Sequence, residues 1–435
     1  MASLLFYSWG EGIYILILLG SIGFNHYISL NIERQKSRKS LIIGLAGNLL
    51  LLAVFKYLNW IFEEFGLLSE PSKGFDVPLI HLPLGISFFT FQAISMLIDV
   101  YRGQKPAKNI FDTGLYIAMF PQLIAGPIVR FNDIHQDILR RRESFSKFSD
   151  GAFIFIIGLS QKVLLADTLA ISADAAFSAP AQELSFTTAW FGLICFSLQI
   201  FYDFAGYSNM AIGLGRFFGF ELPRNFNYPY SAVSFQDFWR RWHMTLSRWF
   251  RDYLYIPLGG SRGGSIKTYR NLFIVFILCG IWHGAAWTFL FWGLWHGAFL
   301  TLERLVGSVK IAVPKLVAMA YVWLFVALGW VLFRAENLPH ALDYWTALSG
   351  LSQPSVPAHI DISRTTQISL VLAIICMWGG WENSYNRTIK EKYLQHSKVQ
   401  FLSQSGLWGA AIVLYLLCFF SIAAQTHQTF IYFRF

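Results

Sequence analysis

Apolar residues run along this chain in blocks of roughly 18 to 25 positions that contain few charges. A helix of about 20 apolar residues is long enough to cross the ~30 Å hydrocarbon core of a bilayer. About ten such blocks can be recognised, so the pattern predicts an all-α polytopic membrane protein with about ten transmembrane helices. We expect ordinary spans at 12–32, 41–62, 77–101, 151–175, 187–214, 313–334, 366–385 and 406–424.

Two other apolar stretches are not expected to form one straight helix each. Residues 109–130 begin and end beside basic clusters and contain Pro121, Gly126 and Pro127, which interrupt a helix. A re-entrant element covered by other parts of the protein fits this pattern. Residues 271–305 also lie between basic clusters, and as one helix they would be ~50 Å long at 1.5 Å per residue. A hairpin or broken helix, bent at Gly280–Gly284, fits better.

Composition and charge support a membrane protein. The 435 residues are 55% hydrophobic and 14% charged, whereas soluble domains carry about 25% charged residues. The net charge of +9 comes from basic residues gathered in alternate loops, which is typical of cytoplasmic loops. Anionic lipid headgroups would bind them, and nucleic-acid binding is not predicted. The basic segments are 33–40, 101–109, 129–148, 216–270, 302–316 and 385–400.

Several further signals are absent. The N-terminus lacks the positive region and the cleavage site of a signal peptide, and on the charge pattern Met1 is expected outside. The four cysteines have unrelated spacings, so no disulfide framework is predicted. The histidines show no metal-like spacing, and no metal site is predicted. No GxSxG, Walker-type or HExxH motif occurs, so a nucleophile is expected to come from a substrate or partner.

His283, in CGIWHGAAW, is the first candidate for chemistry. It lies ~20 Å along a helix from Arg270, near mid-bilayer, and an ionisable residue at that depth is a functional candidate. A neutral imidazole there suits the removal of a proton from a hydroxyl. A core histidine that bridges two helices is an equally good interpretation. His296, thirteen residues later, is expected to be structural and to lie a membrane depth away from His283.

His243 follows Arg240 and Arg241 on a predicted helix in FWRRWH, within a segment of interleaved aromatic and basic residues. That composition suits the cytoplasmic interface, with parts forming amphipathic or re-entrant helices. The arginine pair could bind the phosphates of a nucleotide-type thioester donor such as coenzyme A. Anchoring to lipid headgroups is the commoner use of such arginines. Asp203 could pair with a buried arginine, which we favour, or orient a histidine.

Six stretches together carry a family resemblance, and they extend over nearly the whole chain. The sequence resembles the membrane-bound O-acyltransferase (MBOAT) family, within it the bacterial alginate O-acetyltransferase branch. The stretches are PLGISFFTFQAISMLIDVYR (83–102), FPQLIAGPIVR (120–130), QIFYDFAGYSNMAIGLG (199–215), FNYPYSAVSFQDFWRRWHMTLSRWFRDYLYIPLGGSRGG (226–264), IWHGAAWTFLFWGLWHG (281–297) and the terminal FIYFRF.

The resemblance implies a single transmembrane domain over 1–435, most family-specific at 77–305, with a central tunnel. It implies that His283 is catalytic and that His243 is a second required histidine. Beside them, we expect Arg240 and Arg241 to attract the phosphates of the donor. The expected activity takes acetyl from a cytoplasmic thioester, acetyl-CoA, and passes it across the bacterial inner membrane. A periplasmic SGNH-type partner would then place it on an exported polysaccharide. No permanently bound cofactor is expected.

Two other classes of protein remain open. One is an acyltransferase that moves D-alanyl or another acyl group to a cell-wall polymer, lipid or protein, and the other is a lipid or polysaccharide transporter. Members of the family often begin with a further hydrophobic segment before the FYSWGE-like stretch, whereas this sequence starts there.

Overall fold

The structure, a computed structural model, describes residues 1–66, 79–306, 313–352, 354, 356–358, 360, 362–378 and 397–424. Over these ranges the regular secondary structure is helical and no strand is present. The all-α class predicted from the apolar blocks is therefore confirmed.

The helices differ widely in length. In chain order they are α1 (Ala2–Glu11), α2 (Ile15–Gln35), α3 (Arg38–Glu64), α4 (Ile86–Tyr101), α5 (Ile110–Ala118), α6 (Phe120–Leu123), α7 (Phe131–Arg140), α8 (Phe145–Ser160), α9 (Asp167–Phe177), α10 (Phe186–Phe217), α11 (Phe235–Arg241), α12 (Met244–Phe250), α13 (Ser265–His283), α14 (Trp287–Val306), α15 (Lys315–Arg334), α16 (Leu338–Leu348), α17 (Arg364–Cys376) and α20 (Ser397–Ala423). Two π-helical segments, Gln161–Ala166 and Arg251–Tyr255, follow α8 and α12 directly.

Seven helices in the described ranges are long and apolar enough to cross a membrane, so the expected count of about ten is not confirmed. The block expected at 77–101 forms only the 16-residue helix α4, and the block expected at 366–385 is described only as far as 378, where α17 spans 13 residues. The seven are Ala2–Gln35, Arg38–Glu64, Phe145–Phe177, Phe186–Phe217, Ser265–His283, Lys315–Arg334 and Ser405–Ala423.

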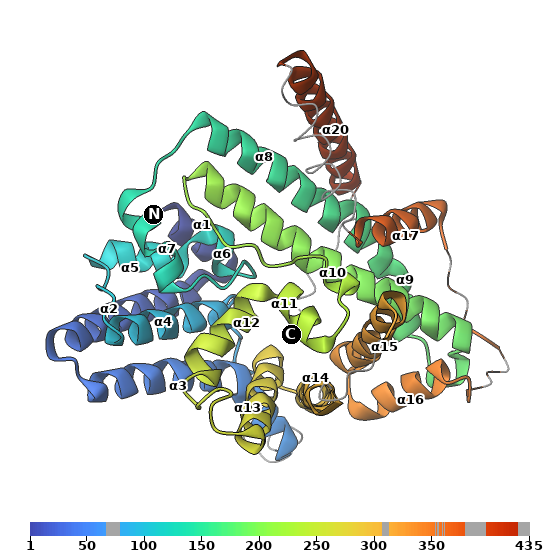
Figure 1. Ribbon diagram of the computed structural model, residues 1–435, viewed down its shortest axis with the longest axis horizontal. Helices are drawn as coiled ribbons and strands as arrows, with labels where there is room; N and C mark the ends of the chain where they lie inside the picture. Colours follow the sequence, from blue (N-terminus) through green and yellow to red (C-terminus); the bar gives the residue numbers. More distant parts are fainter. Residues whose placement is uncertain are drawn as a thin grey trace.

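Helix α10 forms the centre of the molecule. It contacts α8, α9, α15, α16 and α17, and Figure 1 shows it running beside α8 through the middle of the view. Most of its surface is buried inside the protein. The helices α2, α3 and α4 form a separate layer on one side, and α13 and α14 lie near α3.

Glycines explain how closely α8 and α10 approach. Gly151 faces Gly213 and Gly158 faces Gly206, so that a Cβ added at any of them would lie 2.5–2.7 Å from the partner's carbonyl oxygen. Small residues at such crossings allow backbones to pack directly in a membrane, where packing rather than the hydrophobic effect drives helix association.

Both stretches expected to be interrupted are indeed interrupted. Residues 109–130 form α5, the one-turn helix α6 and a non-helical segment from Ile124 to Arg130, of which Ile124–Val129 is buried beneath other elements. Residues 271–305 form the end of α13 and most of α14, separated at Gly284–Ala286. The predicted bend at Gly280–Gly284 thus occurs at its C-terminal end.

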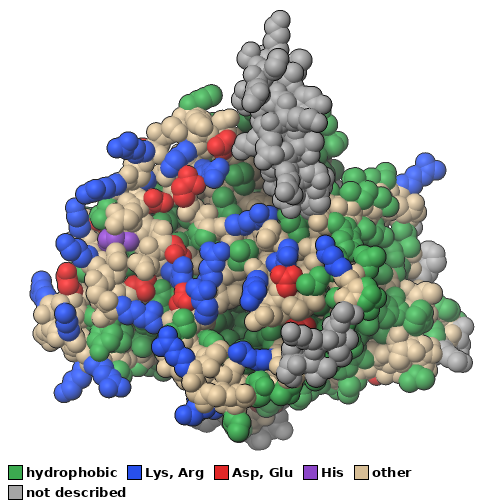
Figure 2. All heavy atoms as spheres, in the orientation of Figure 1, with side chains coloured by type: hydrophobic (Ala, Val, Ile, Leu, Met, Phe, Trp, Pro, Cys, Tyr) green, Lys and Arg blue, Asp and Glu red, His purple; other side chains and the backbone are tan. Residues whose placement is uncertain are grey.

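Basic side chains gather on one face of the molecule. Figure 2 shows Lys and Arg over the region where α11 and α12 lie in Figure 1, while the side near α15 and α17 is mostly hydrophobic. Exposed basic residues of the segment 216–270 include Arg240, Arg251 and Arg262. This distribution fits an interfacial position for α11 and α12.

Candidate active site

His283 is the last residue of α13, and the local sequence explains why the helix ends there. Gly284 adopts an extended conformation, and a Cβ at this position would lie 2.1 Å from the ring of Phe289. The chain then turns back into α14, which runs antiparallel to α13, with Gly280 and Gly293 at the crossing. The turn is fastened to the end of α3, because the indole of Trp287 donates a hydrogen bond to Glu64 at 2.9 Å.

The imidazole of His283 lies in an aromatic environment. Its ring centroid is 4.8 Å from that of Trp282, 4.9 Å from Trp292 and 5.2 Å from Phe333. Only 6% of the residue is exposed. The ring is therefore held by packing on several sides.

A cavity of about 260 Å³ reaches this imidazole. Its wall includes His283 and Trp282 from α13, Lys56 from α3, and the segment from His81 to Phe88 that leads into α4. His81 is half-exposed and binds Glu11 at 2.9 Å, so the cavity extends from a solvent-exposed residue to the buried end of α13. The cavity lies toward the C-terminal end of α3, whose N-terminal end adjoins the basic cluster 33–40.

Lys56 is the site residue that the sequence analysis missed. Its Nζ donates hydrogen bonds to the carbonyl oxygens of Trp282 at 2.5 Å and His283 at 3.1 Å, the last two of α13. The next residue, Tyr57, donates to the carbonyl of Ile281 at 2.7 Å. A lone lysine in the apolar run LLLLAVFKYLNW was the available signal, because a charge within a membrane span is costly and usually functional.

His243 occupies the junction between α11 and α12 and is completely buried. It has a φ of 42°, a left-handed conformation that is uncommon for a residue with a Cβ. The expectation that it would lie within a helix is therefore wrong, because α11 ends at Arg241. The short helices place its ring 6.3 Å from that of Trp282, next to His283 in the chain.

The hydrogen bonds around His243 fix its tautomer. Asn225 Oδ1 accepts from the backbone N–H of Thr245 at 3.3 Å, which identifies it as the oxygen, and it lies 3.1 Å from His243 Nδ1. Nδ1 therefore carries the proton and Nε2 the lone pair. Burial lowers the pKa of His243, so the ring is neutral near pH 7. Its Nε2 has no hydrogen-bond partner among the residues that the structure describes.

Arg240 and Arg241 lie on α11, and neither lines the cavity. Arg241 binds Asp237 at 2.9 Å and also donates to the carbonyl of Asn227 at 3.4 Å, so its guanidinium is engaged within the protein. Arg240 is exposed and forms no ion pair within the described ranges. Of the two, Arg240 is the one free to contact a phosphate or a lipid headgroup.

His296 lies closer to His283 than the sequence analysis expected. Counting thirteen residues along a straight helix put a membrane depth between the two, but the hairpin brings α14 back alongside α13. The ring of Trp292 now packs on both imidazoles, 4.9 Å from His283 and 4.8 Å from His296. His296 is fully buried. The predicted separation between His296 and His283 is therefore wrong, and the structural role of His296 stays a prediction.

Asp203 on α10 pairs with a lysine, where the sequence analysis expected an arginine or a histidine. It binds Lys162 Nζ at 2.6 Å, and Asp167 binds the same Nζ at 2.6 Å. All three side chains are buried, and Lys162 and Asp167 belong to the π-helical segment and the start of α9. The partner of Asp203 is a lysine on the neighbouring helix, whereas the sequence analysis considered only arginine and histidine as partners.

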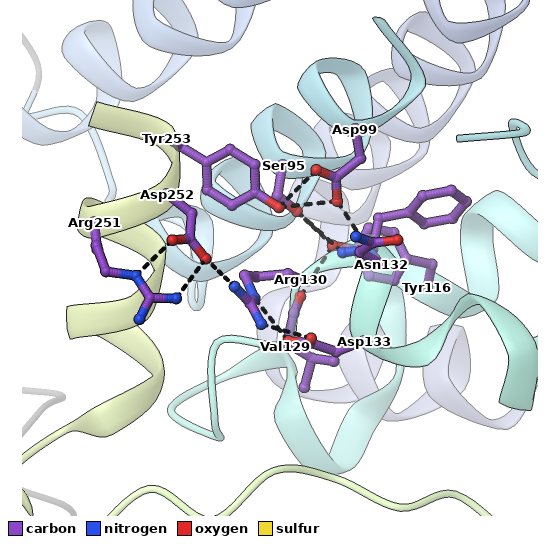
Figure 3. Close-up of polar contacts among 11 residues, drawn as sticks. Ser95, Asp99, Tyr116, Val129, Arg130, Asn132, Asp133, Arg251, Asp252 and Tyr253 are labelled. Atoms are coloured by element: carbon purple, nitrogen blue, oxygen red, sulfur yellow. Dashed lines mark hydrogen bonds and ion pairs between the residues drawn. The ribbon is translucent and has the colours of Figure 1, made fainter. Parts of the chain in front are cut away.

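A second polar cluster holds the segment after α12 in place. Figure 3 shows Asp252 between Arg130 and Arg251, while Asp99 of α4 accepts hydrogen bonds from Tyr253 at 2.9 Å. Arg130 also binds Asp133 at 2.7 Å. Each arginine drawn is paired with a carboxylate, so neither guanidinium charge is left unbalanced. It connects α4, α7 and the segment that begins at His243 and thereby supports the position of that histidine.

These features define a multi-pass helical membrane protein in which buried histidines lie at and near the floor of a cavity. Comparison with known proteins identifies the family of this protein. The model of the membrane-bound O-acyltransferase family, MBOAT, matches residues 109–333. The chain belongs to this family, and it is an O-acyltransferase.

Three relatives show the range of the family around this chain. The chain is 41% identical to "Probable alginate O-acetylase AlgI" of Pseudomonas aeruginosa, over 90% of this chain and 77% of the relative. It is 36% identical to the "Peptidoglycan O-acetyltransferase" of Helicobacter pylori, over 100% and 90%. The "Teichoic acid D-alanyltransferase" of Bacillus subtilis is 29% identical over 58% of this chain and 65% of the relative.

Proposed function

We propose that this protein is an inner-membrane O-acetyltransferase that takes acetyl from cytoplasmic acetyl-CoA and passes it outward for O-acetylation of an exported polysaccharide such as alginate. The observation that carries the proposal is the cavity between His81 and His283. With the basic segment 33–40 on the cytoplasmic side, the C-terminal end of α3 and the cavity mouth face outward.

His283 acts as the general base in this proposal. The acceptor hydroxyl enters from the cavity, and its proton passes to an imidazole nitrogen of His283 as its oxygen attacks the thioester carbonyl. The C–S bond then breaks, and the thiolate of coenzyme A leaves with the proton that His283 received. The acceptor is a hydroxyl of a periplasmic SGNH-type partner, which hands the acetyl group to the polysaccharide. No acyl group needs to rest on this chain.

His243 and Arg240 are assigned to the donor side. The basic face that carries α11 offers Arg240 for the phosphates of the coenzyme, and Arg241 supports that helix through Asp237. His243 presents its Nε2 lone pair among buried aromatic rings, one of which, Trp282, also packs against His283. In this position it orients the donor or accepts a proton on the path to His283.

The test compares secreted and wall polysaccharides by mass spectrometry from cells with the gene, without it, and with it restored. We expect O-acetyl ester on one polysaccharide to disappear with the gene and to return with it. Membranes of the same cells should release free coenzyme A from acetyl-CoA only when the gene is present. Unchanged ester on every polysaccharide would contradict the proposal.

The same measurements separate the alternatives. A D-alanyl transferase, the activity in the name of the Bacillus subtilis relative, would leave acetyl esters unchanged and alter D-alanyl esters. A transporter would change the amount of exported polysaccharide or lipid without releasing coenzyme A. The longer matches to relatives named for O-acetyl transfer favour acetyl as the group transferred.

A further inference from the structure

We propose that Lys56 is a further catalytic residue, whose ammonium group stabilises the negative charge that develops on the acyl carbonyl oxygen during transfer at His283. This inference rests on the proposed function and adds a second group to its chemistry.

The geometry leaves part of the ammonium group available to a ligand. An ammonium has three N–H donors, and Lys56 uses two of them on the carbonyl oxygens of Trp282 and His283 at 2.5 and 3.1 Å. The remaining contact, to Ser87 Oγ at 3.5 Å, is at the limit of a hydrogen bond. Because Lys56, Ser87 and His283 all line the cavity, an oxygen bound beside His283 can replace that weak contact.

Helix capping alone does not account for a charge at this position. A cation near a helix C-terminus is favourable, but a neutral donor can bind the same orphan carbonyls. Tyr57, the next residue of α3, does this through its hydroxyl, which donates to the carbonyl oxygen of Ile281. Lys56 has no carboxylate partner in the described part of the chain, so no ion pair within those residues neutralises its charge. A charged group within a membrane span and beside a cavity is better explained by a ligand that becomes negative.

The charge that Lys56 would meet forms and disappears within one reaction. When the hydroxyl oxygen bonds to the thioester carbon, the C=O π electrons move onto the carbonyl oxygen and leave it negative. When they return, the C–S bond breaks and the sulfur takes its electron pair and then the proton held by His283. A hydrogen-bond donor placed where this oxyanion forms binds the transition state more strongly than the ground state and so accelerates the step.

The first test compares Lys56→Met with Tyr57→Phe. Lys56→Met keeps an unbranched side chain one atom shorter and removes the charge. Tyr57→Phe removes a hydrogen bond to the same end of α13 at a residue that does not line the cavity. Membranes receive radiolabelled acetyl-CoA, and base-labile label on their endogenous macromolecular acceptor is counted per amount of protein. We expect Lys56→Met to lower the rate by about 100-fold or more, as removal of an oxyanion donor does, and Tyr57→Phe to stay within a few-fold of wild type.

Chemical rescue separates charge from volume. Lys56→Cys is treated with 2-aminoethyl methanethiosulfonate, which adds an ammonium at nearly the reach of lysine, or with ethyl methanethiosulfonate, which adds an uncharged chain of similar size. Excess reagent is washed away before acetyl-CoA is added, and wild-type membranes receive the same treatment. We expect only the ammonium to restore label. Equal restoration by both reagents would show that Lys56 merely fills space and would overturn the inference.

His283→Ala membranes distinguish failure of this inference from failure of the proposed function. If His283→Ala is inactive and Lys56→Met transfers acetyl at the wild-type rate, the role of Lys56 is refuted and the function stands. If wild-type membranes transfer no label from acetyl-CoA, the proposed function itself fails.

Discussion

Individual side chains in this protein differ in how far the sequence could identify their roles. His283 and His243 stand out in the chain because imidazoles are rare in apolar and aromatic runs, and the structure brings both next to Trp282. Lys56 carries the same kind of signal but lies in an otherwise uniform apolar run. Its contact with the carbonyls of Trp282 and His283, more than 220 residues away in the chain, could not be inferred from either segment alone.

The tautomer of His243 leads to a prediction for a substitution at this residue. His243→Asn keeps a donor toward Asn225, and asparagine tolerates the left-handed backbone at φ 42°. The variant loses the imidazole ring and with it the Nε2 lone pair. We expect it to accumulate like wild type and to transfer acetyl about 100-fold more slowly, within the range of general acid–base effects. The check is labelled-acetyl transfer per amount of protein in membranes, and a wild-type rate would show that Nε2 has no role.

Helices were predicted well where apolar length decided the outcome and less well where packing did. The break in 271–305 followed from basic residues at both ends of a stretch too long for one span, and it occurs at Gly284–Ala286. The approach of His296 to His283, with the ring of Trp292 packed on both, depends on how the two helices pack, and a count along one straight helix missed it. The partner of Asp203 likewise lies on another helix.

The close crossing of α13 and α14 leads to a prediction for substitutions of its glycines. A Cβ at Gly280 would lie 2.3 Å from the carbonyl oxygen of Phe289, whereas a Cβ at Gly297 of the same hairpin would meet side-chain atoms of Phe273 and Phe276 at 3.4 Å. Gly280→Ala must therefore push the helices apart and move His283. We expect it to cost about 1–3 kcal/mol, as overpacking does, and to lower activity.

The matched variant Gly297→Ala should stay close to wild type in both properties. Melting temperature in detergent and acetyl transfer in membranes measure the two effects. Equal behaviour of Gly280→Ala and Gly297→Ala would mean that close approach of these helices does not hold the end of α13.

The whole molecule combines two faces with different chemistry. One face carries basic residues over α11 and α12 (Figure 2), and the cavity enters near the C-terminal end of α3, the end away from the basic segment 33–40. Buried aromatic rings pack against both His243 and His283. The apolar blocks were enough to predict a polytopic membrane protein, while the assignment of the basic face to the cytoplasm stays a prediction. The central tunnel implied by the family resemblance stays a prediction. The residues that line the cavity could not be predicted, because they come from α3, α13 and the segment before α4, which are distant in the chain.

The most direct measurement of the central claim compares His283→Ala with His26→Ala in membranes that receive labelled acetyl-CoA. His26 hydrogen-bonds Thr113 and does not line the cavity, so it controls for the loss of an imidazole elsewhere. With protein amounts matched, we predict that His283→Ala loses at least about 100-fold in acetyl transfer while His26→Ala retains most of it. Wild-type transfer by His283→Ala would contradict the account.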